Sequence, residues 1–131
     1  MARIVLKTAR DRDQYVIWGS IVDDVIAGPG TRTDAADYLR TECGYTADEA
    51  EVALARVDER GSSDISPIRF GSWHDDPLPC GEDDAGRYEL ARDRLADYAD
   101  ALAASNEAAA RALLVQHEQP DPTQPNRSNP Q

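Results

Sequence analysis

Residue types that perform acid–base and nucleophilic chemistry lie close together between Ser72 and Cys80. His74 is followed directly by Asp75 and Asp76, so one short segment carries an imidazole and two carboxylates. A hydrolytic triad needs a histidine oriented by a carboxylate beside an oxyanion hole, and the spacing here matches no such motif. We favour a solvated loop histidine at position 74. The alternative is a metal-dependent or hydrolytic enzyme centred on His74.

The cysteines and histidines could together supply four zinc ligands, because thiolates and imidazoles are the groups that zinc prefers. These residues are Cys43, His74, Cys80 and His117. Structural zinc sites usually draw their ligands from closely spaced pairs, and this chain has none. The acidic pairs at 23–24 and 75–76 also lack the calcium-loop pattern. We therefore expect neither a metal nor a cofactor.

A glycine-rich segment, Gly28-Pro29-Gly30-Thr31, lies between a predicted strand and a predicted helix, where phosphate-binding loops occur. It lacks the lysine and the glycine spacing of a P-loop, and Pro29 has no N–H for a phosphate to bind. The segment is better interpreted as a turn.

Three strands are predicted in the first 30 residues. Residues 3–8 alternate in polarity, residues 14–22 are rich in β-formers, and residues 25–26 form a short third strand that ends at 28–30. Together they predict an antiparallel meander. If Tyr15, Ile17 and Ile21 point inward, Val16 and Trp18 point outward and form an exposed apolar pair.

Two short amphipathic helices should follow the meander. One is capped by Thr31 or Thr33 and ends at Gly44. The other begins with a capping box, Thr46 with Glu49, and ends at Gly61. Ile68 and Phe70 alternate in the manner of a fourth short strand, around residues 68–70.

Residues 84–118 predict one long helix, since they contain no proline, a single glycine, and many Ala, Leu, Arg and Glu residues. About 35 residues would make a rod of about 50 Å, which is longer than the roughly 35 Å diameter of such a domain. The far half would then rest on another molecule. A break near Ser105 and Asn106 is the alternative.

The predicted fold class is α+β, in the order β-β-β-α-α-(β)-α. A small antiparallel sheet of three to four strands packs on two short helices and one long C-terminal helix. Residues 1–118 form a single domain, and residues 119–131, which are rich in Pro, Gln and Asn, form a disordered tail.

The formal net charge of −11 argues against direct binding to nucleic acid, which requires clustered Lys and Arg. No apolar run approaches the roughly 20 residues of a membrane span. Two distant cysteines and the lack of a secretory signal predict a reduced, cytoplasmic setting. The single lysine beside many arginines resembles the composition of proteins from high-GC bacteria and their phages.

These observations predict a non-enzymatic, acidic protein-binding or regulatory module whose partner is another protein, and the negative net charge favours a basic one. The candidate contact residues are Val16, Trp18, Trp73, Leu113 and Leu114. Two further alternatives are a nucleic-acid mimic that inhibits a DNA- or RNA-binding protein, and a homo-oligomeric structural protein that associates through the long helix.

Overall fold

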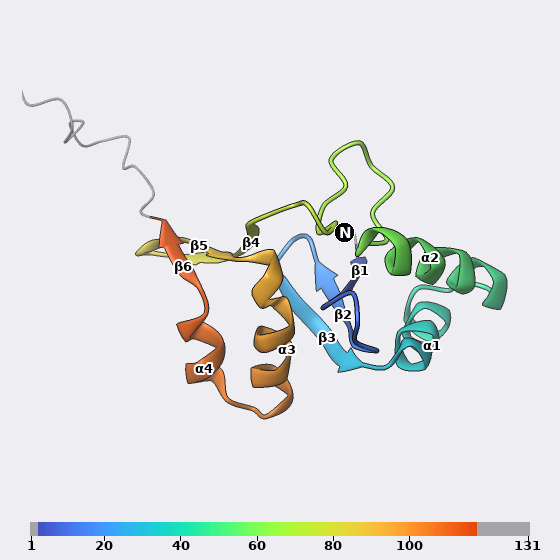
Figure 1. Ribbon diagram of the computed structural model, residues 1–131, viewed down its shortest axis with the longest axis horizontal. Helices are drawn as coiled ribbons and strands as arrows, with labels where there is room; N and C mark the ends of the chain where they lie inside the picture. Colours follow the sequence, from blue (N-terminus) through green and yellow to red (C-terminus); the bar gives the residue numbers. More distant parts are fainter. Residues whose placement is uncertain (1–2, 118–131) are drawn as a thin grey trace, which may run out of the picture.

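The computed structural model describes residues 3–117, so the expected tail at 119–131 lies outside the described residues. Two three-stranded antiparallel sheets and several helices make up an α+β fold, the predicted class (Figure 1). The elements are β1 (Arg3–Lys7), β2 (Tyr15–Gly19), β3 (Asp24–Gly30), α1 (Arg32–Glu42), α2 (Ala47–Arg60), β4 (Leu78–Asp83), β5 (Gly86–Leu90), the 3-10 turn η1 (Arg92–Arg94), α3 (Leu95–Ala103), α4 (Glu107–Ala112) and β6 (Val115–His117).

The first sheet, in the order β1-β2-β3, is covered on both faces. Tyr15 and Ile17 of β2 point toward α1 and α2, where they form one hydrophobic core with the buried residues of those helices. Val16 and Trp18 point the other way, into a second core with β4, β5 and α3. Figure 1 shows this arrangement: α1 and α2 lie on one side of the sheet, and α3 and the β4–β5 hairpin lie on the other.

The prediction that Val16 and Trp18 form an exposed pair is therefore wrong, because both side chains are 0% exposed. The alternation along β2 was interpreted correctly, but the outer face that it defines is covered by segments some 60 residues later in the chain. Ile21 was expected to point inward and is instead 70% exposed, since β2 ends at Gly19 and residues 20–23 form the turn into β3.

The two short helices form as predicted. Thr46 and Glu49 make both bonds of a capping box at the start of α2, and Thr31 and Asp34 make the same pair of bonds at the start of α1. Gly61 ends α2 in the left-handed conformation, with a φ of 88°. The face of α2 expected to be buried is buried: it carries Ala50, Ala53, Leu54 and Val57.

The long helix predicted for residues 84–118 is absent from the fold, and the complete predicted order is not matched. Residues 83–86 form the tight turn of the β4–β5 hairpin, in which Asp83 accepts from the backbone N–H of Ala85. Leu78 and Leu90, which face each other in this hairpin, are fully buried against the first sheet. Burial of these side chains outweighs the helix propensity of the segment, which is worth only tenths of a kcal/mol per residue.

The remaining helical residues are divided between α3 and α4 at the break that the sequence analysis gave as its alternative. Ser105 has a φ of 55°, and the Asn106 side chain accepts from Ala109 to cap α4. The chain then returns to the hairpin as β6, so the expected overhanging rod does not exist. The fourth strand predicted around residues 68–70 does not form, and these residues lie in turns within the loop that joins α2 to β4. None of the helices between residues 3 and 117 is both long and apolar enough to cross a bilayer.

A buried cation, Arg92 of η1, connects the C-terminal part of the chain to β1 and to the end of α2. Its guanidinium donates to the carbonyl of Gly71 at 2.9 Å, to that of Lys7 at 2.7 Å and to that of Gly61 at 3.2 Å. It also lies 4.8 Å from the centre of the Trp73 ring. Burial lowers the pKa of Arg92 to about 10, which still leaves it charged at neutral pH.

We expect Arg92→Leu to lower the free energy of unfolding by about 3–5 kcal/mol, because several buried carbonyl groups would lose a charged donor together. Urea denaturation followed by circular dichroism measures this change. The matched control is Arg94→Leu, which removes an exposed i,i+3 ion pair with Asp97 and should cost less than about 0.5 kcal/mol. Equal losses in the two variants would contradict the assigned role of Arg92.

Candidate functional site

The segment around His74 is organised by backbone hydrogen bonds. The Asp75 carboxylate accepts from the N–H of Gly71 at 2.7 Å, and the Asp76 carboxylate accepts from the N–H of Arg92 at 2.8 Å. The His74 side chain is exposed. Both neighbouring carboxylates thus hold the loop in place, and these bonds give no support to an acid–base role for His74.

Cys43, His74 and Cys80 are not brought together into a metal site. Among the side chains that the structure describes, residues 3–116, no group of three or more from His, Cys, Asp or Glu is placed to hold a metal ion. Cys80 is buried, and its thiol donates to the Tyr98 hydroxyl at 3.6 Å, which in turn donates to Asp24 at 2.8 Å. Burial raises the pKa of the Cys80 thiol to about 11, so it is a poor nucleophile at neutral pH.

The glycine-rich segment 28–31 leads into α1, but two backbone donors at the start of that helix already have acceptors. The N–H of Thr31 donates to the Asp34 carboxylate, and the N–H of Arg32 donates to the Asp13 carboxylate, both at 2.9 Å. A phosphate at this helix terminus would have to displace two carboxylates. The interpretation of the segment as a turn is wrong for residues 28–30, because the pairing of β3 with β2 continues to Gly30, which lies opposite Tyr15.

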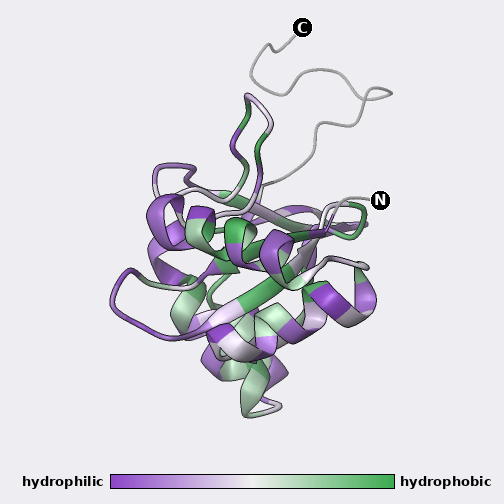
Figure 2. Ribbon diagram, turned by 90° about the vertical axis from the view of Figure 1, so that its right-hand side faces the viewer, coloured by the Kyte–Doolittle hydropathy of each residue, from purple (hydrophilic) through white to green (hydrophobic). Residues whose placement is uncertain are grey.

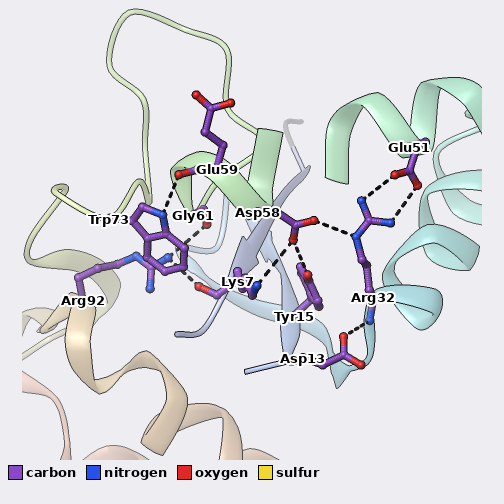
Figure 3. A network of polar contacts seen from close by, with 10 residues as sticks. All are labelled: Lys7, Asp13, Tyr15, Arg32, Glu51, Asp58, Glu59, Gly61, Trp73 and Arg92. Atoms are coloured by element: carbon purple, nitrogen blue, oxygen red, sulfur yellow. Dashed lines mark hydrogen bonds and ion pairs between the residues drawn. The ribbon is translucent and has the colours of Figure 1, made fainter. Parts of the chain in front are cut away.

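Trp73, a predicted contact residue, lies against arginines of its own chain. Arg10 and Arg92 are each 4.8 Å from its ring centre. Figure 3 shows Arg92 beside the ring and the indole N–H, which donates to the carbonyl of Glu59 at 3.0 Å. Leu113 and Leu114 are partly buried and pack against the core shared with β4, β5 and α3. A role for these three residues in partner binding stays a prediction.

An ionic network that the sequence did not reveal connects α1, α2 and the first sheet. Arg32 donates to Asp58 and, through two parallel hydrogen bonds, to Glu51, while the Tyr15 hydroxyl donates to Asp58 (Figure 3). Lys7 also approaches Asp58, at 3.8 Å. Residues far apart in sequence contribute to this network, and no local motif indicates it. It ties α1 and α2 to the first sheet.

A surface of exposed apolar side chains lies between α2 and the loop that follows it. Tyr45, Val52 and Ile65 line a hollow of about 370 Å³, and Ile68 lies further along the same loop. Ile65 is 74% exposed and Ile68 is 79% exposed. We call these four residues the loop surface. Figure 2 shows apolar stretches on both arms of the loop that rises from the body.

This loop is held in shape by the side chain of Asp64. Its carboxylate accepts from the N–H and the hydroxyl of Ser66 and from the N–H of Phe70 at 2.7 Å, which closes residues 64–70 into a ring. Burial by itself would raise the pKa of Asp64, but these hydrogen bonds outweigh it and lower the pKa. The two isoleucines are therefore presented by a preorganised loop.

A second exposed apolar surface lies at the turn between β2 and β3. Val22 and Ile26 both lie over Gly19, where an added Cβ would come within 2.9 Å of Ile26 and 3.3 Å of Val22. Ile21 is next to them in the turn. Asp23, the following residue, lines a hollow of about 470 Å³ together with Glu82 of the β4–β5 hairpin. We call Ile21, Val22, Asp23, Ile26 and Glu82 the turn surface.

Sequence analysis missed both apolar surfaces, although part of the signal was present. Val52 falls off the predicted buried face of α2, so its exposure could have been inferred. The exposure of Ile65 and Ile68 depends on the hydrogen bonds within the loop, which the sequence pattern does not indicate. Comparison with known proteins adds nothing to these surfaces: no family model, curated protein or solved structure matches the chain.

Cys43 and Cys80 should differ in their reactivity toward thiol reagents, because only Cys43 is partly exposed. In native protein at about pH 8, Cys43, which is partly exposed, should react with a thiol reagent, whereas Cys80 should react only after unfolding, since roughly a thousandth of it is thiolate. Titration with Ellman's reagent with and without urea measures this. The Cys43→Ser variant should show no fast reaction, and fast labelling of Cys80 in that variant would contradict its assigned environment.

The Asp58 network should make stability depend on pH. Burial would raise the pKa of Asp58, but the bonds from Tyr15 and Arg32 outweigh it and lower the pKa. Because the folded-state pKa lies below the unfolded value near 4, the stabilisation is present above about pH 4 and is lost as the pH falls through the folded-state value.

We therefore expect Asp58→Asn to cost about 1 kcal/mol at neutral pH, a figure reduced because the carboxylate is partly exposed, and the difference from wild type to shrink below about pH 4. Urea denaturation at a series of pH values tests this. Asp97→Asn, which removes the carboxylate of an exposed i,i+3 pair, is the control and should cost less than about 0.5 kcal/mol. A pH-independent cost for Asp58→Asn would be inconsistent with the network.

Proposed function

We propose that this protein is a non-enzymatic, acidic protein-binding module that contacts its partner through the loop surface. The observation that carries the proposal is the pair of isoleucines, Ile65 and Ile68, which the Asp64 carboxylate holds in a closed loop while both side chains stay largely exposed. Exposing two large aliphatic side chains of one loop to water is unfavourable, so a partner that covers them gains hydrophobic free energy.

Preorganisation supports the same role. A loop that is already fixed by hydrogen bonds loses little conformational entropy when it binds, and that loss is a principal cost of association. Tyr45 and Val52 beside the loop enlarge the apolar area, and the hollow between them could receive a side chain of the partner. We assign the protein to a reduced cytoplasm, where Cys43 and Cys80 would remain free thiols.

The alternative functions have less support in the contacts observed. The carboxylates of Glu51, Asp58 and Asp100 are bonded to arginines of the same chain, which weakens their use as phosphate mimics. An oligomer built on an overhanging helix loses its basis because α3 and α4 are short and separate.

The direct test is site-specific photo-crosslinking in the source cell. A photoreactive amino acid at position 68 should give a discrete adduct with one protein, identified by mass spectrometry, because that position would lie inside the interface. The same amino acid at position 108, an exposed site on α4, is the matched control and should not give that adduct.

With the partner identified, Ile65→Ser combined with Ile68→Ser should weaken binding by about tenfold or more, since two buried aliphatic contacts would be lost. Isothermal titration calorimetry measures the affinity. Because both side chains are exposed, the double variant should unfold within about 0.5 kcal/mol of wild type. Identical adducts at positions 68 and 108, or unchanged affinity of the double variant, would refute the proposal.

A further inference from the structure

We propose that the turn surface is a second, separate docking site, and that it binds a polypeptide segment in which an arginine or lysine lies next to an aliphatic residue. The site combines two features that lie side by side in the fold. One is the group of aliphatic side chains on the β2–β3 turn, and the other is the acidic hollow between that turn and the β4–β5 hairpin.

The aliphatic part is formed by Ile21, Val22 and Ile26, all of which are exposed. Val22 lies in the turn and Ile26 lies in β3, and both side chains lie over Gly19, which leaves no room for a side chain beneath them. The turn itself is closed by a hydrogen bond from the N–H of Asp23 to the carbonyl of Gly19, at 2.9 Å. This part of the surface is therefore a compact apolar patch on a defined backbone, which suits an aliphatic side chain of a partner.

The acidic part determines the charge of the partner. Asp23, Glu82 and Glu89 line the hollow together with one arginine, Arg87. That arginine pairs with Glu82 at 3.8 Å, but both side chains are largely exposed, so the pair is weak. Within residues 3–117, no arginine or lysine lies within ion-pair distance of Asp23.

Asp23 is the best-placed acceptor for a cation of the partner. Its partial burial raises its pKa, and the negative charge of Glu82 raises it further, so the ionised carboxylate is poorly compensated by its surroundings. A guanidinium or ammonium group in the hollow would supply the missing compensation.

At the rim, a second arginine, Arg111, lies over the Tyr88 ring and 3.9 Å from Asp83, so it does not compensate Asp23. The charge of the whole chain, −11, favours the approach of a basic segment by long-range attraction.

This inference does not depend on the loop surface. The two surfaces involve different elements, β2, β3 and the β4–β5 hairpin for one, and α2 with the following loop for the other. A substitution in one surface should therefore leave binding at the other unchanged, which allows each proposal to fail separately.

The probe for the test is a synthetic peptide of alternating arginine and leucine, added to the full-length protein labelled with ¹⁵N. We expect saturable chemical-shift changes centred on residues 19–26 and 80–89. Two analogues, one with glutamine for arginine and one with serine for leucine, should each bind much more weakly, because each lacks one of the two required features.

Asp23→Asn should weaken binding of the arginine–leucine peptide by about threefold or more, the loss expected for one ion pair at a partly buried position. Asparagine tolerates the left-handed backbone of residue 23, whose φ is 50°, so the turn should be preserved. Asp48→Asn, an exposed carboxylate on α2, removes the same charge and is the matched control. Ile26→Ser should also weaken binding, whereas Ile68→Ser should not.

Three results would overturn the inference. The first is equal binding of the serine analogue, which would show attraction by charge alone. The second is a set of shift changes spread over all acidic surfaces, or located only at residues 45–68. The third is the lack of saturable binding up to about 1 mM peptide, the weakest affinity that a specific docking site would have.

Discussion

Both faces of strand β2 are buried, and this constraint determines how the rest of the chain is arranged. Tyr15 and Ile17 require a hydrophobic layer on one face, and α1 and α2 supply it. Val16 and Trp18 require another layer on the opposite face, which the second sheet and α3 supply. A strand of five residues without an exposed side chain needs cover on both faces of its sheet, so the chain must contribute a layer from each side.

In addition to the two hydrophobic cores, polar contacts of two arginines connect elements of the fold. Arg92 reaches from the C-terminal half to carbonyl groups near β1 and the end of α2, and Arg32 bridges α2 to the beginning of α1. A guanidinium group suits this role because it remains charged when buried and offers several donors in a fixed plane. Carboxylates also stabilise the backbone: Asp13, Asp34 and Asp64 each accept a hydrogen bond from a backbone N–H group.

The two surfaces available for binding lie where the layers leave apolar residues uncovered. Each contains aliphatic side chains on a short segment whose backbone is closed by hydrogen bonds, through Asp64 in one case and through Asp23 and Gly19 in the other. Exposed hydrophobic patches mark candidate interaction sites, and a defined backbone lowers the entropic cost of binding at each of them. The proposed functions therefore follow from exposure and rigidity, and require no reactive side chain.

The sequence alone determined much of the local structure of the first half of the chain: the strands of the meander, a helix cap at Thr31 or Thr33, the capping box at Thr46, and the buried face of α2. Those features depend on interactions within a few residues, so composition and spacing reveal them. Only the tertiary structure decided that Trp18 is buried and that residues 84–118 divide into a hairpin, two short helices and a strand. Helix propensity is a small term for each residue, whereas covering the second face of β2 buries whole side chains, and no pattern in the sequence shows which distant segment will cover it. The candidate surfaces were hidden for the same reason, since exposure is decided by what the remainder of the chain leaves uncovered.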